Sequence, residues 1–275
     1  MLMPVVGQSA LTLAAGVVAL LAYAAAAARA ERVFHPLRWA LTVGWLAHAA
    51  ALILDTSGVG SAVEGARFGF APALSVTLWL VLAVYAIESR FVPLPGVQRW
   101  LAALGALAVA LMLLFPGEVR PHIASPWLPL HWVLGIASYG LFGAAVLHAG
   151  LLTNAERQMR QHRGLSQPTP LGLPLLRLEK LTFRFVAAGF AVLSAALLMG
   201  WWFAQPWRWD HKTVFSLLAW LVFAGLLAGR QGFGWRGRKA TRWLYTGAGL
   251  LLLAYVGSRF VVEVLIQRAA SGASL

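Results

Sequence analysis

The sequence predicts an all-α protein, a polytopic bundle of eight transmembrane helices. Hydrophobic residues make up 60% of its 275 residues and charged residues only 11%, and the mean hydropathy is +0.74. Soluble domains carry about 25% charged residues. Eight segments approach the roughly 20 apolar residues that cross a bilayer. Because the polar stretches between them are short, we expect residues 1–275 to form a single transmembrane domain.

The eight predicted spans follow one another along the whole chain. They cover residues 7–28, 39–54, 71–89, 100–115, 130–152, 185–204, 213–229 and 243–266. The first contains AAAAARA, which resembles a signal-peptide cleavage site, but no Lys or Arg precedes its apolar run. Arg29 and Arg32 follow the run instead. This pattern predicts a retained helix whose N-terminus lies outside. The second and fourth spans are shorter than the rest.

Three of the spans contain or adjoin candidate functional residues. His48 lies inside the second span, where an ionisable group is a candidate site by default; a neutral histidine bonded to a neighbouring helix also accounts for it. His131 lies at the start of the fifth span. His148 follows 17 residues later, about 25 Å along a helix, so the two cannot share one ligand. Asp210 directly precedes the seventh span, where its carboxylate would cap the helix.

The distribution of basic residues predicts the orientation of the bundle. The first, third, fifth and seventh loops hold 16 of the 22 Lys and Arg residues, and their net charge is +12. The opposite side carries a net charge of +1. Since Lys and Arg accumulate in cytoplasmic loops, we expect both termini on the outer, periplasmic side of a bacterial inner membrane. Membrane topology and anionic lipid explain the basic excess, so it does not indicate nucleic-acid binding.

The gap between the sixth and seventh spans is polar and aromatic, reading GWWFAQPWRWDHKTVFSLLAW over residues 200–220. Its residues and His131 are predicted at the same membrane depth. Imidazoles bind haem iron axially, indole faces stack on a porphyrin, and cations pair with its propionates. Interfacial Trp residues also anchor membrane proteins without binding a ligand. The predicted outer side offers His122, His131 and His211 for iron, Trp207 and Trp209 for stacking, and Arg120, Arg208 and Lys212 for propionates.

Three motifs in the second half of the chain carry a family resemblance. The segment WRWDHKTVFSLLAW resembles the WxWDxK motif of the cytochrome c assembly family, haem-handling membrane proteins of the CcsA and CcmC type. The run LPLHWVLGIASYGLF resembles the family's outer histidine helix, and GRQGFGWRGRKA its basic loop ahead of the last helix. The end, YVGSRFVVEVLI, is closer to the HemX and YpjD-type branch. The family-like core covers residues 119–266.

The resemblance implies that Trp207, Trp209 and Asp210 present haem at the outer surface and that His131 is the first of two flanking iron ligands. The second flanking histidine of the family is missing from the region of Val262 and Glu263. His211, at the position of the family's usual Pro, or His122 would have to replace it. The implied role is therefore to hold, deliver or regulate haem, without catalytic ligation.

Two other function classes remain open on the sequence alone. The chain could be an accessory component of membrane metal-ion transport that keeps the fold without haem, or a structural subunit of an assembly complex. The expected partners are the lipid bilayer, haem and other cytochrome c biogenesis subunits, and no nucleic acid. The chain contains no cysteine, so histidine is the main candidate metal ligand, with His131 and His211 foremost.

Overall fold

The computed structural model describes residues 8–28, 34–58, 66–88, 95–120, 128–161, 175–203, 209–257 and 260. These residues form two compact units. The first comprises Met1–Pro126 and Val256–Leu275, and the second Trp127–Tyr255.

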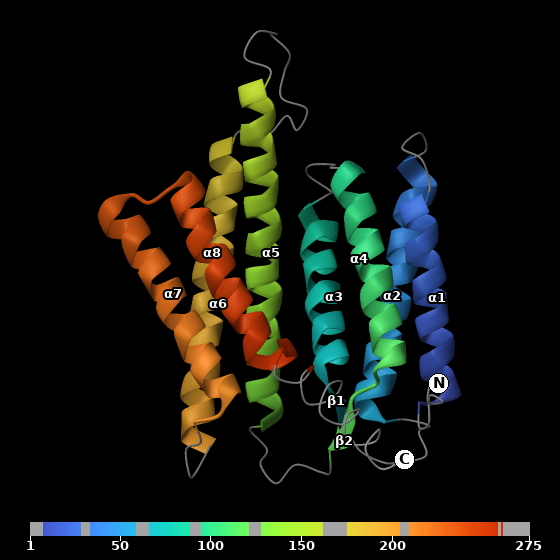
Figure 1. Cartoon of the computed structure of the whole chain (residues 1–275). Coiled ribbons are helices and arrows are strands. Elements are labelled where there is room, and N and C mark those ends of the chain that lie inside the picture. Colours follow the sequence, from blue (N-terminus) through green and yellow to red (C-terminus); the bar gives the residue numbers. More distant parts are fainter. Residues whose placement is uncertain are drawn as a thin grey trace, which may run out of the picture. The chain divides into compact units, whose positions relative to one another are not determined.

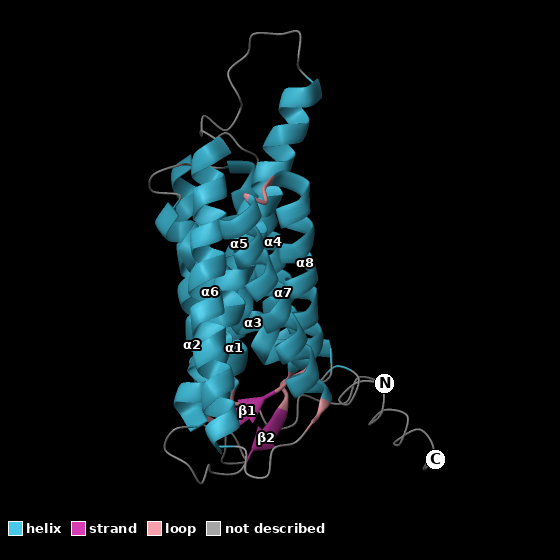
Figure 2. Ribbon diagram, turned by 90° about the vertical axis from the view of Figure 1, so that its left-hand side faces the viewer, coloured by secondary structure: helices cyan, strands magenta, loops and turns pink. Residues whose placement is uncertain are grey.

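The first unit contains four helices, and each packs against its neighbours in the unit. They are α1 (Ala10–Ala28), α2 (Phe34–Ser57), α3 (Phe70–Glu88) and α4 (Pro95–Leu114). Two short strands, β1 (Ala66–Phe68) and β2 (Glu118–Arg120), pair antiparallel with Arg67 opposite Val119. Figure 2 shows the strands side by side at one end of these helices. The sequence did not predict this ribbon, because a three-residue pairing leaves almost no periodic pattern.

A hydrogen-bonded chain of polar side chains crosses the interior of the first unit. The fully buried His48 of α2 lies 3.3 Å from the Tyr23 hydroxyl of α1 through Nδ1 and 2.7 Å from the Ser75 hydroxyl of α3 through Nε2. Gly44 and Gly105 leave room for the Tyr23 ring, since a Cβ at either would lie 2.8 to 3.1 Å from it. Both ring nitrogens of His48 are thus engaged, which confirms the simpler expectation for this residue.

The second unit also contains four helices, named α5 (Leu128–Gln161), α6 (Leu175–Phe203), α7 (His211–Phe233) and α8 (Gly237–Leu252). A π-helical segment, Leu253–Gly257, continues α8, and its residues up to Tyr255 belong to this unit. Across the described residues of both units, seven helices are long and apolar enough to cross a membrane, and the 16-residue α8 is shorter than these. The predicted all-α, multi-pass membrane fold is therefore confirmed.

The core of the second unit is built on one aromatic stack. The rings of Phe142 on α5 and Phe223 on α7 lie 3.7 Å apart and nearly parallel. Gly189 on α6 and Gly247 on α8 face these two rings, and a Cβ at Gly247 would lie 2.7 Å from Phe223. Small residues at helix interfaces allow this close approach. The stack therefore fixes the mutual positions of all four helices of this unit.

We expect Gly247→Ala to lower the stability of the full-length protein by about 1–3 kcal/mol, because the added methyl group overpacks the aromatic stack. Gly249→Ala is the matched control, since nothing lies within 4 Å of a Cβ at that position of the same helix. Thermal unfolding in detergent measures both variants. Equal stability of the two would contradict this account of the core.

Candidate functional site

Successive helices of the second unit run antiparallel, so α5 and α7 begin where α6 and α8 end (Figure 1). We call this the His131 end. It collects the first turn of α5, the last turn of α6, the first turn of α7 and the π-helical segment. Chain order alone thus brings together the described part of the predicted site.

His131 is held by a hydrogen bond to the neighbouring helix. Its Nδ1 lies 2.9 Å from the backbone carbonyl oxygen of Ala196 on α6. Because a carbonyl can only accept, Nδ1 carries the proton and Nε2 keeps its lone pair. Within the described residues, no hydrogen bond to Nε2 accompanies this one. A histidine oriented in this way can bind a metal through the lone pair of Nε2.

Gly200, in the last turn of α6, makes room for the imidazole. A Cβ at this position would lie 3.1 Å from Cε1 of His131, closer than most Cβ contacts in proteins. The absence of a side chain therefore lets α5 and α6 approach closely enough for the bond to Ala196. The sequence analysis did not identify Gly200 as a site residue. Its position directly before Trp201 was the only feature that could have indicated this role.

Three tryptophans at the His131 end present their indoles to the surroundings. Trp201 and Trp202 at the end of α6 are 61% and 75% exposed, and Trp209, just before α7, is 72% exposed. Aromatic faces this open can contact either lipid or a planar ligand. Trp207 and Arg208, which the sequence singled out with them, lie outside the described residues.

Asp210 caps α7. It has an extended backbone conformation, and its Oδ1 accepts a hydrogen bond of 2.8 Å from the backbone N–H of Thr213. This satisfies one of the unpaired amides at the start of the helix and places negative charge at the positive end of its dipole. The predicted cap is present, and it fixes the direction in which His211 and Lys212 leave the turn.

Lys212 links three elements of the site. Its ammonium lies 5.4 Å from the ring centroid of Tyr255 in the π-helical segment, within cation–π range. It also lies close enough to the His131 imidazole to interact with it electrostatically. His211 is exposed beside it. The structure therefore gathers His131, His211 and Lys212 at one end of the second unit.

The role of Tyr255 had no signal in the sequence, because it depends on the π-helical segment. π-Helical turns interrupt the regular α-helical bonding pattern and often occur at functional sites. Tyr139 of α5 donates its hydroxyl hydrogen to the backbone carbonyl of Leu251, just before this segment. The bond ties α5 to the end of α8 below His131, and so helps to set the position of Tyr255.

The remaining candidates do not join this cluster. His122 lies outside the described residues, and Arg120 belongs to β2 in the first unit. His148 is buried, with Nδ1 2.7 Å from the carbonyl oxygen of Ala144 in the preceding turn. No group of three or more His, Asp or Glu side chains in the described ranges is placed to hold a metal ion.

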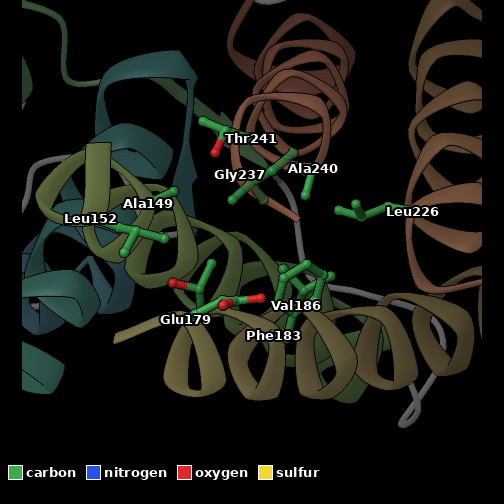
Figure 3. Close-up of a pocket in the computed structure, with 11 residues that line it drawn as sticks. Ala149, Leu152, Glu179, Phe183, Val186, Leu226, Gly237, Ala240 and Thr241 are labelled. Atoms are coloured by element: carbon green, nitrogen blue, oxygen red, sulfur yellow. The ribbon is translucent and has the colours of Figure 1, made fainter. Parts of the chain in front are cut away.

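A cavity lies at the opposite end of the second unit, near the start of α6 and α8 (Figure 3). Glu179, Thr182 and Phe183 contribute to its lining, together with Gly237 and Thr241. Its volume of about 20 Å³ is enough for about one water molecule. A tetrapyrrole cannot enter this cavity.

Comparison with known proteins shows similarity to one protein family. Residues 64–266 match the family model described as "Cytochrome C assembly protein". The chain is 29% identical over 198 residues to "Inner membrane protein YpjD" of Escherichia coli K12, covering 70% of this chain and 73% of the relative. It is 26% identical over 245 residues to "Cytochrome c biogenesis protein CcsA" of Gloeobacter violaceus, covering 67% and 72%. No solved structure matches significantly.

Asp210→Ala is expected to destabilise the protein by about 1 kcal/mol, the usual effect of losing a helix cap. Asp210→Asn should retain most of that stability, because an amide oxygen can still accept the Thr213 hydrogen bond. Chemical unfolding in detergent compares the two. Equal destabilisation would mean that the charge of Asp210, and not its cap, matters for folding.

Proposed function

Since this chain belongs to the cytochrome c assembly protein family, we propose that it binds haem at the His131 end of its second unit. The seven apolar helices among its described residues make it a multi-pass membrane protein, and its YpjD relative is named an inner membrane protein. We therefore assign it to the inner membrane. The basic loops of the sequence orient the His131 end toward the outer side.

The hydrogen bond between His131 and Ala196 is the observation that carries this proposal. Histidines that ligate metals usually donate their other ring N–H to a carbonyl or carboxylate, which fixes the tautomer and the ring orientation. His131 has this arrangement in the structure. Bound haem would supply an iron centre, and Nε2 of His131 is the protein atom proposed to hold it.

The surroundings of His131 suit the rest of a haem. The exposed indole of Trp209, and that of Trp207 by its place in the motif, would pack on the porphyrin face. Lys212, near both His131 and Tyr255, would pair with a propionate, and Arg208 is a second candidate from sequence. Asp210 holds the start of α7 in place.

The proposed role is to hold or deliver haem and not to form covalent bonds. Among the described residues, His211 is exposed at the start of α7, at the same end of the unit as His131. His211, or His122 from the preceding loop, would provide the second iron ligand. Either residue replaces the second flanking histidine that the sequence lacks. The resulting site would release haem more readily than a pair of two buried histidines.

Absorbance spectroscopy of the detergent-purified protein, before and after haem addition, tests the proposal. The full-length protein is expected to show a Soret band, and His131→Ala should reduce haem occupancy more than about tenfold, because it removes an iron ligand. His148→Ala is the control on the same helix and should retain the band. Absence of a Soret band from the reconstituted full-length protein would overturn the proposal.

His148 is a stringent control because it is buried and His131 is only partly so. Truncating a buried side chain leaves a cavity and destabilises the fold more than truncating a surface one. If haem loss followed destabilisation, His148→Ala would lose more haem than His131→Ala. The opposite order is the expected result.

Gly200→Val should weaken haem binding by about 10- to 100-fold without removing any ligand, because the new side chain displaces the imidazole from Ala196. Gly232→Val is the matched control, since Gly232 also lies in the last turn of a helix and has no atom within 4 Å of its Cβ position. Haem titration followed at the Soret band measures both. Equal affinities would show that the His131 orientation is unimportant.

A further inference from the structure

The segment from the last turn of α7 to the first turns of α8, residues 230–242, concentrates positive charge at the end of the second unit opposite His131. We call this segment the α7–α8 turn. It holds five basic residues and no acidic one: Arg230, Arg236, Arg238, Lys239 and Arg242. Among the described residues, Glu179 of α6 forms the ion pairs with this turn. Its Oε1 lies 2.6 Å from Arg230 and 3.3 Å from Arg236. Subtracting this carboxylate leaves a net charge of about +4.

The ion pairs with Glu179 separate Arg230 and Arg236 from the other three cations. Arg230 also lies over the Phe183 ring at 3.6 Å and is partly buried, so it serves the packing of α6 against α7. Arg238, Lys239 and Arg242 are exposed on the first turns of α8. Among the described residues, no carboxylate forms an ion pair with any of these three. Their charge therefore faces the surroundings of the protein.

The backbone of the turn is fixed. Gly234 adopts the left-handed conformation (φ 63°), and the N–H groups of Gly234 and Trp235 bond back to the carbonyls of Arg230 and Gly229. This is the usual glycine-terminated end of a helix. Trp235 then folds over Gly229, where any Cβ would lie 2.4 Å from its indole. The cations that follow thus start from a defined position.

An aromatic cluster orders the side chains beside the cations. Trp235 packs against Trp243 with ring centroids 5.0 Å apart, and Lys239 lies over the Trp235 ring at 3.8 Å. Phe233 stacks on Trp235 from the end of α7 but remains 81% exposed. A basic surface and a large apolar side chain are therefore contiguous at this turn.

The position of the turn relative to the bilayer selects the ligand. The membrane span His211–Phe233 ends at the exposed Phe233, and the three cations follow within nine residues. The phosphates of a lipid leaflet lie just beyond the hydrocarbon, where Lys and Arg attract anionic headgroups. A soluble anion or an acidic peptide would explain the cations but not the exposed Phe233 at the edge of the hydrocarbon.

We propose that this turn is a binding site for one anionic phospholipid. Arg238, Lys239 and Arg242 bind the headgroup phosphate, and Phe233 contacts the adjoining acyl chain. The small cavity beneath Gly237 and Thr241 stays outside the site, because its 20 Å³ admits water only (Figure 3). The site is distinct from the haem site proposed at the other end of the unit and does not depend on it.

Native mass spectrometry of the full-length protein tests the site. The protein is delipidated in detergent and incubated with equal amounts of phosphatidylglycerol and phosphatidylcholine of identical acyl chains. The full-length protein should retain phosphatidylglycerol preferentially. Arg238→Gln/Arg242→Gln should reduce that preference about tenfold, since each cation near a headgroup contributes measurably to binding. Arg99→Gln/Arg184→Gln removes two exposed arginines elsewhere and should leave it unchanged.

Each other result overturns the site. Equal loss of the phosphatidylglycerol preference in both double variants would show that the preference depends only on the net charge of the protein. No preference in the full-length protein would exclude an anionic-lipid site. Displacement of the lipid by millimolar inorganic phosphate would identify a soluble phosphate as the ligand. Because the substituted arginines are exposed, thermal unfolding of both variants should match that of the parent protein, which shows that folding is intact.

Discussion

One hydrogen bond, from His131 to the carbonyl of Ala196, determines what the His131 end can do. It selects the tautomer, orients the ring and fixes α5 against α6 at the membrane surface. The bond is possible because Gly200, one helical turn beyond Ala196, carries no side chain. A single hydrogen bond inside a membrane protein contributes only about 0.6–2 kcal/mol to stability. Its importance here therefore lies in the orientation of an imidazole more than in the stability of the bundle.

Hydrogen bonding also distinguishes the histidines inside the spans from His131. Inside the spans, His48 is hydrogen-bonded to Tyr23 and Ser75 of other helices, and His148 to Ala144 of its own helix. A bilayer offers no water to satisfy them. His131 differs from both, because it lies at the end of its span, is only partly buried and is bonded through Nδ1 to a neighbouring helix. This combination, and not histidine content, is the reason for proposing the site at His131.

Much of the fold could be predicted from the sequence, because the requirement for apolar spans leaves a strong pattern. Each predicted span overlaps a helix, but α2, α5 and α7 extend beyond both predicted ends, and α4, α6 and α8 begin earlier than predicted, since helices continue past the hydrocarbon. The continuously described part of the eighth span ends at Gly257, before the predicted end at residue 266. The position of His131 near a helix start and the Asp210 cap were predictable from the sequence. Gly200, Tyr255 and the β1–β2 ribbon were not. Their roles depend on contacts between elements distant in sequence, or on a local change in helical geometry.

The two ends of the second unit are specialised in opposite ways by the same helices. At the His131 end, α7 begins with a capped turn, exposed indoles and one lysine, so it suits a planar ligand bearing few negative charges. At the other end, α7 terminates in a glycine cap followed by three uncompensated cations, so it suits a phosphate at the lipid surface. The Phe142–Phe223 stack lies between them and keeps α5 and α7 in register. A haem-handling site on one leaflet would thus be held at constant depth by a lipid contact on the other.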